Sequence, residues 1–201
     1  MSIYTKCIII GDIGVGKSSI IMRYTDNIYL QHDYDDPTIG VGYMVKRVNH
    51  LGGQIKICIW DASGYPSYRS IVRSYYKHVN LVILVYDVTN RDSFDNLDIW
   101  VEDVKKHTNA HDIILVANKV DEYGIRLISP NQGDEYARKN GMQYIETSAK
   151  NDMNIDTIFS QHIHDMWVDG TTGHTDDIQS AEREICSFDV IIERCISIFG
   201  I

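Results

Sequence analysis

The 201-residue sequence predicts an α/β fold, in which a mostly parallel β-sheet is covered by helices on both faces. Short apolar runs that resemble strands alternate with longer segments whose apolar residues recur at helical spacing. Such alternation requires crossover connections, which make neighbouring strands parallel. Two of the runs are separated only by a Leu-Gly-Gly turn, so we expect one hairpin and one antiparallel edge strand.

The order of elements follows from these apolar runs. Strands are expected at residues 6–10, 41–49, 54–60, 81–86, 113–117 and 143–146. Helices are expected to begin after Gly16, Pro66, Arg91, Pro130 and Asn151. Within the third and fifth of these helical segments, apolar residues repeat at a spacing that places them on one buried face. The six strand segments are therefore expected to form a single sheet.

Composition and charge divide the chain into a domain at 1–167 and a linker with an apolar tail at 168–201. Residues 169–177 are rich in Gly, Thr and Asp, which is typical of a linker, and an apolar-periodic stretch follows at 181–201. The formal net charge of −9 argues against nucleic acid as a partner, because nucleic-acid binding needs a basic face. Cys7 and Cys58 lie in apolar runs and are expected to be buried thiols in a reducing, cytoplasmic setting.

A glycine-rich segment between the first strand and the first helix is the strongest functional signal. It reads Gly11-Asp12-Ile13-Gly14-Val15-Gly16-Lys17-Ser18 and is followed by Ser19. The pattern G-x-x-x-x-G-K-[ST] predicts a loop whose backbone N–H groups surround phosphate oxygens. Lys17 is expected to face the outer phosphates, and the Ser18 hydroxyl is expected to bind Mg²⁺. The start of the following helix adds partial positive charge at this point.

Two further segments are expected to approach the metal and the last phosphate. Asp61 ends an apolar strand and Gly64 follows three residues later, so the carboxylate can reach Mg²⁺ through water and the Gly64 N–H can reach the γ-phosphate. Thr38 follows Pro37 in the loop after the first helix. Its hydroxyl is a candidate second ligand of Mg²⁺.

The purine is expected to be recognised by two later loops. Asn118-Lys119-Val120-Asp121 follows a buried strand, and Asp121 can accept hydrogen bonds from N1–H and the exocyclic amine of guanine. Adenine lacks that pair of donors, so the site predicts GTP/GDP rather than ATP. Ser148, Ala149 and Lys150 belong to a second loop, in which the Ala149 N–H supports the base edge. Tyr29 is a candidate aromatic contact to the base, with a packed surface tyrosine as the alternative.

The order of these five motifs resembles the Ras superfamily of small GTPases, and the flanking sequence resembles its Rab branch. The Rab-like segments are Ile39-Gly40-Val41, Ile59-Trp60-Asp61, Tyr75-Tyr76 and Leu84-Val85-Tyr86-Asp87-Val88-Thr89-Asn90. The resemblance, which covers residues 4–167, implies the G-domain fold of P-loop NTPases, built on a six-stranded sheet. It also implies slow hydrolysis of GTP and binding of effector, exchange and activating proteins through loops near 33–41 and 64–76.

The chain departs from that family pattern at three places. Tyr65 stands where the family usually has the glutamine that orients the attacking water, so we expect weak intrinsic hydrolysis, with Lys17 and Thr38 completing the catalytic set. Ile13 stands where small residues are usual, so we expect weak stimulation by activating proteins. Cys195 is too far from the last residue to form a prenylation signal, which makes membrane attachment uncertain.

Three functions are compatible with these residues. The leading hypothesis is a GTP/GDP-dependent switch in membrane traffic, cytoplasmic or peripheral on membranes. The second is a hydrolysis-deficient GTP-binding scaffold that recruits partners, which Tyr65 and Ile13 favour. The third is a metabolic kinase that uses the same phosphate loop, but such an enzyme would not need the Asn118–Asp121 motif. Within the 181–201 tail, residues 185–201 are apolar enough to pack on the domain, on a partner or on a membrane surface. We expect packing on protein, with Cys186 and Cys195 unmodified.

Overall fold

The structure is a computed structural model that describes residues 2–30, 37–108, 110 and 112–169. The strands are β1 (Ser2–Gly11), β2 (Val41–His50), β3 (Gly53–Ala62), β4 (Leu81–Asp87), β5 (Asp112–Asn118) and β6 (Gln143–Glu146). The helices are α1 (Lys17–Asp26), α2 (Arg69–Ser74), α3 (Arg91–Asp95), α4 (Leu97–His107), α5 (Pro130–Asn140) and α6 (Thr157–Asp169). Two short 3-10 helices, η1 (Pro66–Tyr68) and η2 (Tyr123–Ile125), complete the described part.

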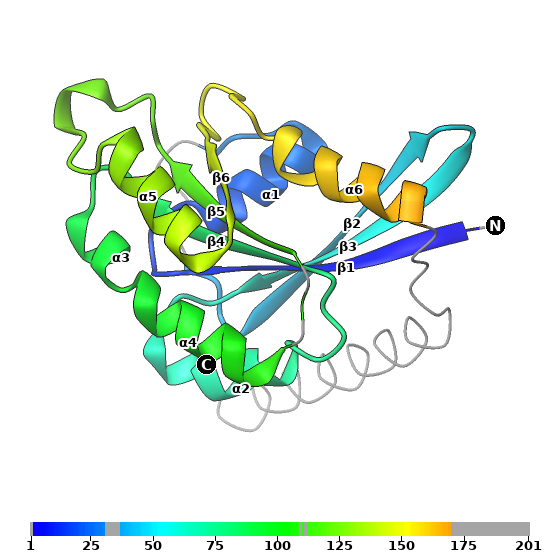
Figure 1. Cartoon of the computed structure of the whole chain (residues 1–201), viewed down its shortest axis with the longest axis horizontal. Coiled ribbons are helices and arrows are strands. Elements are labelled where there is room, and N and C mark those ends of the chain that lie inside the picture. The colour runs from blue at the N-terminus through cyan, green and yellow to red at the C-terminus, as the bar shows by residue number, and fades with distance from the viewer. Residues whose placement is uncertain (1, 31–36, 109, 111, 170–201) are drawn as a thin grey trace, which may run out of the picture. The chain divides into compact units, whose positions relative to one another are not determined.

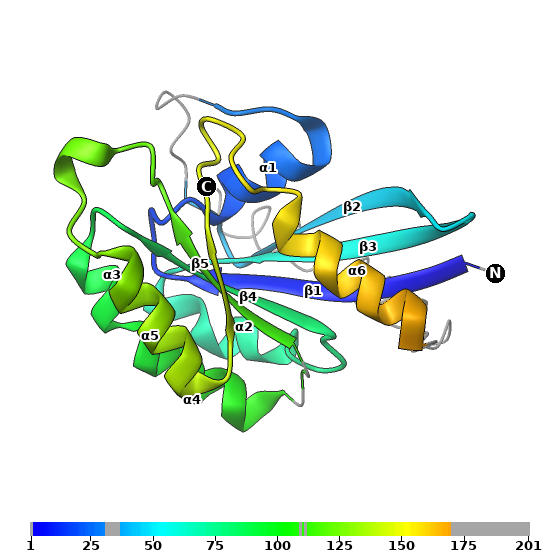
Figure 2. The same ribbon diagram turned by 45° about the horizontal axis from the view of Figure 1, so that its top comes forward.

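The strands form one six-stranded sheet in the order β2-β3-β1-β4-β5-β6. All neighbouring pairs are parallel except β2 and β3, which form the antiparallel hairpin around Leu51 and Gly52. The helices α1 and α6 lie on one side of the sheet, and α2 and α4 lie on the other (Figures 1 and 2). The predicted α/β class, the six strands and the antiparallel edge strand are therefore confirmed.

The core follows from the two periodicities of the sequence. Alternate residues of β1, such as Cys7 and Ile9, face the same buried cluster as Ile20 of α1 and Phe159 of α6. The ring of Tyr24 stacks on Phe159 with 3.8 Å between the centroids, which fixes α1 against α6. Cys7 and Cys58 are both buried, as the apolar runs around them predicted.

Three helical segments differ from the sequence-based prediction. The segment after Pro66 begins as the 3-10 helix η1, and α2 starts only at Arg69. The segment after Arg91 is broken at Asn96, so it forms α3 and α4 rather than one helix. The last helix begins at Thr157, not directly after Asn151. The intervening residues form turns, because Asp152 and Asn154 adopt positive φ angles and Ser148 pairs with Met153 in an isolated bridge. Among the described residues, no helix combines the length and the apolar character that crossing a bilayer requires.

Candidate functional site

The predicted site residues gather at the carboxyl ends of the parallel strands. The loop after β1, the loop after β3 and the loop after β5 meet there because β3, β1, β4 and β5 are consecutive and parallel in the sheet. Two adjoining pockets lie at this edge, with volumes of about 420 and 290 Å³. Gly16, Ser19, Tyr29 and Lys119 line both pockets. The two pockets therefore offer one continuous site with two chemically different halves.

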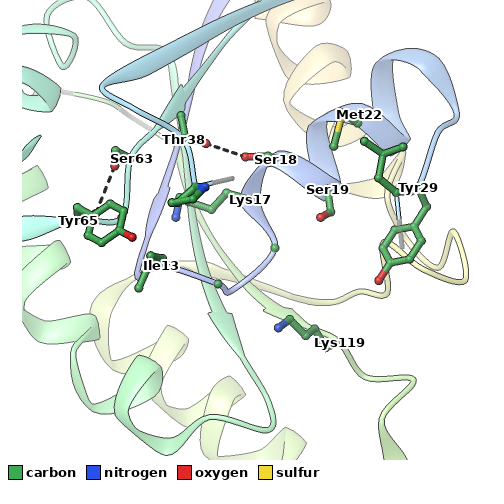
Figure 3. A pocket seen from close by; sticks show the side chains of 15 residues that line it. Ile13, Lys17, Ser18, Ser19, Met22, Tyr29, Thr38, Ser63, Tyr65 and Lys119 are labelled. Atoms are coloured by element: carbon green, nitrogen blue, oxygen red, sulfur yellow. Dashed lines mark hydrogen bonds between the residues drawn. The ribbon is translucent and has the colours of Figure 1, made fainter. Parts of the chain in front are cut away.

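The larger pocket contains the glycine-rich loop and the residues expected near Mg²⁺. It is lined by Ile13, Gly14, Gly16, Lys17, Ser18, Ser19, Met22, Tyr29, Leu30, Pro37, Thr38, Ser63, Gly64, Tyr65 and Lys119. Figure 3 shows Ser18 and Thr38 facing each other, with Ile13 and Tyr65 on one side of the pocket and Tyr29 on the other. Of the residues predicted to surround the phosphates and the metal, Gly11, Asp12, Val15 and Asp61 are not among those that line this pocket, whereas the others line it.

Lys17 is buried in the glycine-rich loop with its ammonium held by two carbonyls. Its Nζ donates to the carbonyl oxygens of Gly11 and Asp12 at 3.0 and 2.7 Å. Burial lowers the pKa of Lys17 to about 8, although the charges of Asp61 and Asp12 oppose that shift. Bound phosphate would supply the negative charge that the buried ammonium otherwise lacks. The geometry therefore fits the predicted role of Lys17 at the outer phosphates.

Three oxygen atoms from separate segments converge beside Lys17. The Ser18 hydroxyl donates to Asp61 Oδ2 at 2.5 Å, the Thr38 hydroxyl donates to the same oxygen at 3.2 Å, and the two hydroxyl oxygens lie 3.0 Å apart. The other oxygen of Asp61 is buried and makes no hydrogen bond within the described part of the chain. Burial raises the pKa of Asp61, and the Ser18 hydrogen bond and the Lys17 charge counteract it. This all-oxygen donor set, with one unsatisfied carboxylate oxygen, fits Mg²⁺.

Two glycines permit close backbone approach at this site. A Cβ at Gly64 would lie 2.3 Å from the Ile13 backbone nitrogen, so the segment after β3 packs directly on the glycine-rich loop. Gly16 has a φ of +92°, and a Cβ there would lie 2.4 Å from Asn118 Nδ2. Any side chain at these two positions would separate the segments that build the phosphate pocket.

The smaller pocket contains the two loops expected to recognise the base. It is lined by Gly16, Ser19, Tyr29, Thr89, Asn118, Lys119, Asp121, Glu122, Ile125, Ala149 and Lys150. The Asp121 carboxylate is almost fully buried and accepts a hydrogen bond from the Ser148 hydroxyl at 2.6 Å. A carboxylate can accept several hydrogen bonds, so Asp121 retains the capacity to accept two more from guanine.

Asn118 joins the base loops to the phosphate loop. Its Nδ2 donates to the Val15 carbonyl at 2.9 Å, and its Oδ1 accepts from the Thr147 hydroxyl at 3.2 Å. The Asn118 side chain is buried, and these bonds connect segments that are 103 and 29 residues away. These two hydrogen bonds brace the base loops against the phosphate loop.

Two supporting contacts were not predicted from the sequence. The Asp12 carboxylate accepts hydrogen bonds from Asn96 Nδ2, between α3 and α4, and from Trp100 Nε1 of α4, both at 2.7 Å. Asp87, at the end of β4, lies 2.7 Å from Lys119 Nζ. Asp87 pairs in register with Asn118 of β5, the residue before Lys119. This contact therefore follows from the order of the strands in the sheet.

Tyr65 lies at the edge of the larger pocket, and 36% of its surface is exposed. Its backbone N–H donates to the Ser63 hydroxyl at 3.4 Å, and its ring lies 6.4 Å from that of Tyr68. Ile13 also lines this pocket and is 45% exposed. The two departures from the usual pattern thus occupy the same side of the site (Figure 3). Of the predicted partner loops, residues 33–36 lie outside the described residues, as does the tail at 181–201.

A comparison with known protein families agrees with this geometry. The sequence model of the Ras family matches residues 6–167, which include every element from the glycine-rich loop to most of α6. The match covers well over half of the chain. It also covers both pockets and all the loops that form them.

Proposed function

The chain belongs to the Ras family of small GTPases, and from that premise we propose that it is a Rab-like switch in membrane traffic with slow intrinsic GTP hydrolysis. Proteins of this family bind guanine nucleotides with Mg²⁺ and hydrolyse GTP. The observation that carries the proposal is the pair of adjoining pockets, one with convergent oxygens for a metal and one with a buried carboxylate for guanine.

The proposed switch depends on loops rather than on rigid strands. Thr38 lies in the segment before β2, and Gly64 lies in the segment after β3. Both would respond to a γ-phosphate through backbone or hydroxyl groups. Exposed apolar residues lie near both, since Ile39 next to Thr38 is 73% exposed and Ile71 of α2 is 41% exposed. Such residues provide a surface that a partner can bind in only one nucleotide state. A large population shift needs a difference in binding free energy of about 5 kcal/mol between the states.

In the Mg²⁺-GTP complex, each residue has a separate task. Lys17 would hold the outer phosphates, Ser18 and Thr38 would ligate the metal, and Asp61 would contact it through water. The metal would neutralise part of the negative charge that develops on the phosphates. Tyr65 has a phenol that can accept or donate one hydrogen bond, whereas a carboxamide offers a paired donor and acceptor for the attacking water. Slow hydrolysis follows from that difference.

The second candidate is a GTP-binding scaffold that recruits partners without useful hydrolysis. Tyr65 and Ile13 favour it because both line the side of the pocket where hydrolysis must be assisted. The convergence of Ser18, Thr38 and Asp61 favours the switch, because a permanent scaffold has no need for groups that respond to the γ-phosphate. Localisation in the cytoplasm, with or without peripheral attachment to membranes, belongs to the same proposal.

The test begins with the nucleotide that co-purifies with the full chain. We expect GDP or GTP to co-purify. We also expect the melting temperature in Mg²⁺ to rise when either nucleotide is added. Lys17→Ala is expected to abolish binding of the triphosphate. A wild-type protein that emerges without nucleotide and shows no shift with GDP or GTP would contradict the proposal. Release of phosphate from bound GTP then separates the switch from the scaffold.

A further inference from the structure

Arg23 of α1 connects two loops that are far apart in the sequence and that both line the base pocket. Its Nε donates to the Ala149 carbonyl at 2.9 Å, and its Nη2 donates to the Lys150 carbonyl at 3.3 Å. Its Nη1 donates to the Asn27 carbonyl and to Asn27 Oδ1 at 3.1 and 3.0 Å. One guanidinium group therefore contacts the loop after β6 and the loop after α1 at the same time.

The first of these loops includes the backbone expected to contact guanine. Ala149 is 3% exposed, and both Ala149 and Lys150 line the base pocket. The Ser148 hydroxyl on the same loop donates to Asp121. By holding two successive carbonyl oxygens, Arg23 fixes the orientation of the peptide groups in this loop.

The second loop begins at the end of α1 and leads to Tyr29. Asn27 ends the helix with a left-handed backbone, at φ 56° and ψ 35°, which is a conformation that non-glycine residues adopt at a cost. Arg23 stabilises this conformation through two hydrogen bonds to Asn27. Two residues further on, the Tyr29 ring lies 5.9 Å from the guanidinium carbon and lines both pockets.

We propose that Arg23 is a positioning residue that holds these two walls together and thereby sets the rate at which guanine nucleotide leaves. The inference rests on the proposed function, because it requires that a guanine base occupies this pocket. A base in this pocket would lie between the two loops, so its release would require these walls to separate. The planar guanidinium is suited to this task because its N–H donors form a rigid fork that reaches acceptors on both sides, whereas the donors of a lysine ammonium all lie on one rotatable nitrogen.

The experiment measures release of GDP labelled with a fluorescent N-methylanthraniloyl group from the full chain, after addition of excess unlabelled GDP. Arg23→Ala is expected to accelerate release about tenfold, since the hydrogen bonds are partly exposed and each contributes modestly. Arg23→Lys is expected to fall between Arg23→Ala and the wild type. The matched control is Arg138→Ala, which removes an exposed arginine from α5 together with its ion pair to Asp134. The control is expected to release GDP at the wild-type rate.

A second measurement separates positioning of the base from a general loss of structure. Chelation of Mg²⁺ weakens the phosphate side of the site, so all variants should release GDP faster in a chelating buffer. If Arg23 acts on the base side, the ratio of the Arg23→Ala rate to the wild-type rate should be the same in both buffers. An effect confined to the Mg²⁺ buffer would place Arg23 on the metal side and overturn the inference.

Other outcomes also decide the question. Release from Arg23→Ala within twofold of the wild type, or equal acceleration by Arg138→Ala, would overturn the inference. If Arg23→Ala does not fold, Asn27→Gly tests the same link, because glycine keeps the positive φ accessible and removes only the side-chain acceptor. Asn27→Gly should release GDP severalfold faster, and a wild-type rate would reject the link. A wild-type protein that binds no guanine nucleotide contradicts the proposed function, whereas normal release from a binding-competent Arg23→Ala contradicts this inference alone.

Discussion

The two halves of the nucleotide site differ in how completely their side chains are held. On the base side, Asn118 is buried, the Asp121 side chain is only 8% exposed, and both are hydrogen-bonded to groups on other loops. On the γ-phosphate side, Ile13 and Tyr65 are exposed at the pocket edge, and neither matches the residue type that the family usually has. Recognition of guanine needs acceptors at fixed positions, which requires such a network. The proposed slow hydrolysis depends on Tyr65, which lies on the exposed side of the site.

Asp121→Asn is the change expected to have the largest effect on this contrast. The amide places an NH₂ group where guanine needs an acceptor, so two charge-assisted hydrogen bonds are lost. Affinity for GDP should fall about 100-fold or more, and preference should shift toward xanthosine diphosphate. Displacement of a fluorescent nucleotide by each unlabelled diphosphate measures both affinities.

The matched control is Glu122→Gln, which removes a neighbouring carboxylate that lines the same pocket and lies 3.5 Å from Lys150. Its affinity for GDP should stay within about threefold of the wild type, because a partly exposed ion pair contributes little. Asp121→Asn with unchanged selectivity would mean that the base is not read by Asp121.

Tyr65→Gln is expected to raise intrinsic hydrolysis about tenfold, because the carboxamide restores a paired donor and acceptor for the attacking water. The rate is measured in a single turnover of GTP bound to the full chain. Tyr68→Gln is the control, since it alters the neighbouring ring and should leave the rate unchanged. No increase in Tyr65→Gln would show that the slow step lies elsewhere, and would weaken the contrast between the two halves.

Tyr86→Phe is expected to have the smallest effect, and it probes the packing behind the base loop. The Tyr86 hydroxyl lies 3.4 Å from that of Tyr144, which donates to Glu146 at 2.8 Å. Burial raises the pKa of Tyr86 to about 12 from an ordinary value near 10. Between those values the folded chain keeps a proton that the unfolded chain has lost, so stability falls as pH rises through this window.

Removal of that hydroxyl should lower the free energy of unfolding by about 1 kcal/mol at pH 7. It should also make the loss of stability above pH 10 shallower. Urea denaturation at pH 7, 9 and 10.5 measures both effects. The control is Tyr123→Phe, in which a 78% exposed ring loses its hydroxyl without a change in slope. If the free energy of unfolding falls equally steeply with pH in Tyr86→Phe and in the wild type, this phenol does not couple folding to pH.

Much of the fold could be predicted from local patterns. Short apolar runs located all six strands, and the Leu-Gly-Gly turn located the hairpin. The start of α6 was placed too early because positive φ angles at Asp152 and Asn154 depend on the turn that Ser148 and Met153 close. The contact of Asp12 with Trp100 was missed because the two residues are 88 positions apart and neither type signals the other.

The sequence alone determined which chemical groups this site contains. Three local motifs indicate those groups without knowledge of the strand order: the glycine-rich loop, the carboxylate after a buried strand and the asparagine–aspartate pair. The tertiary structure decided how those groups are supported. Sheet order brings Asp87 to Lys119, α4 donates a hydrogen bond to Asp12, and Arg23 joins the two walls of the base pocket. These contacts arise from packing between segments that are distant in the sequence. The local sequence does not indicate which of these segments become neighbours.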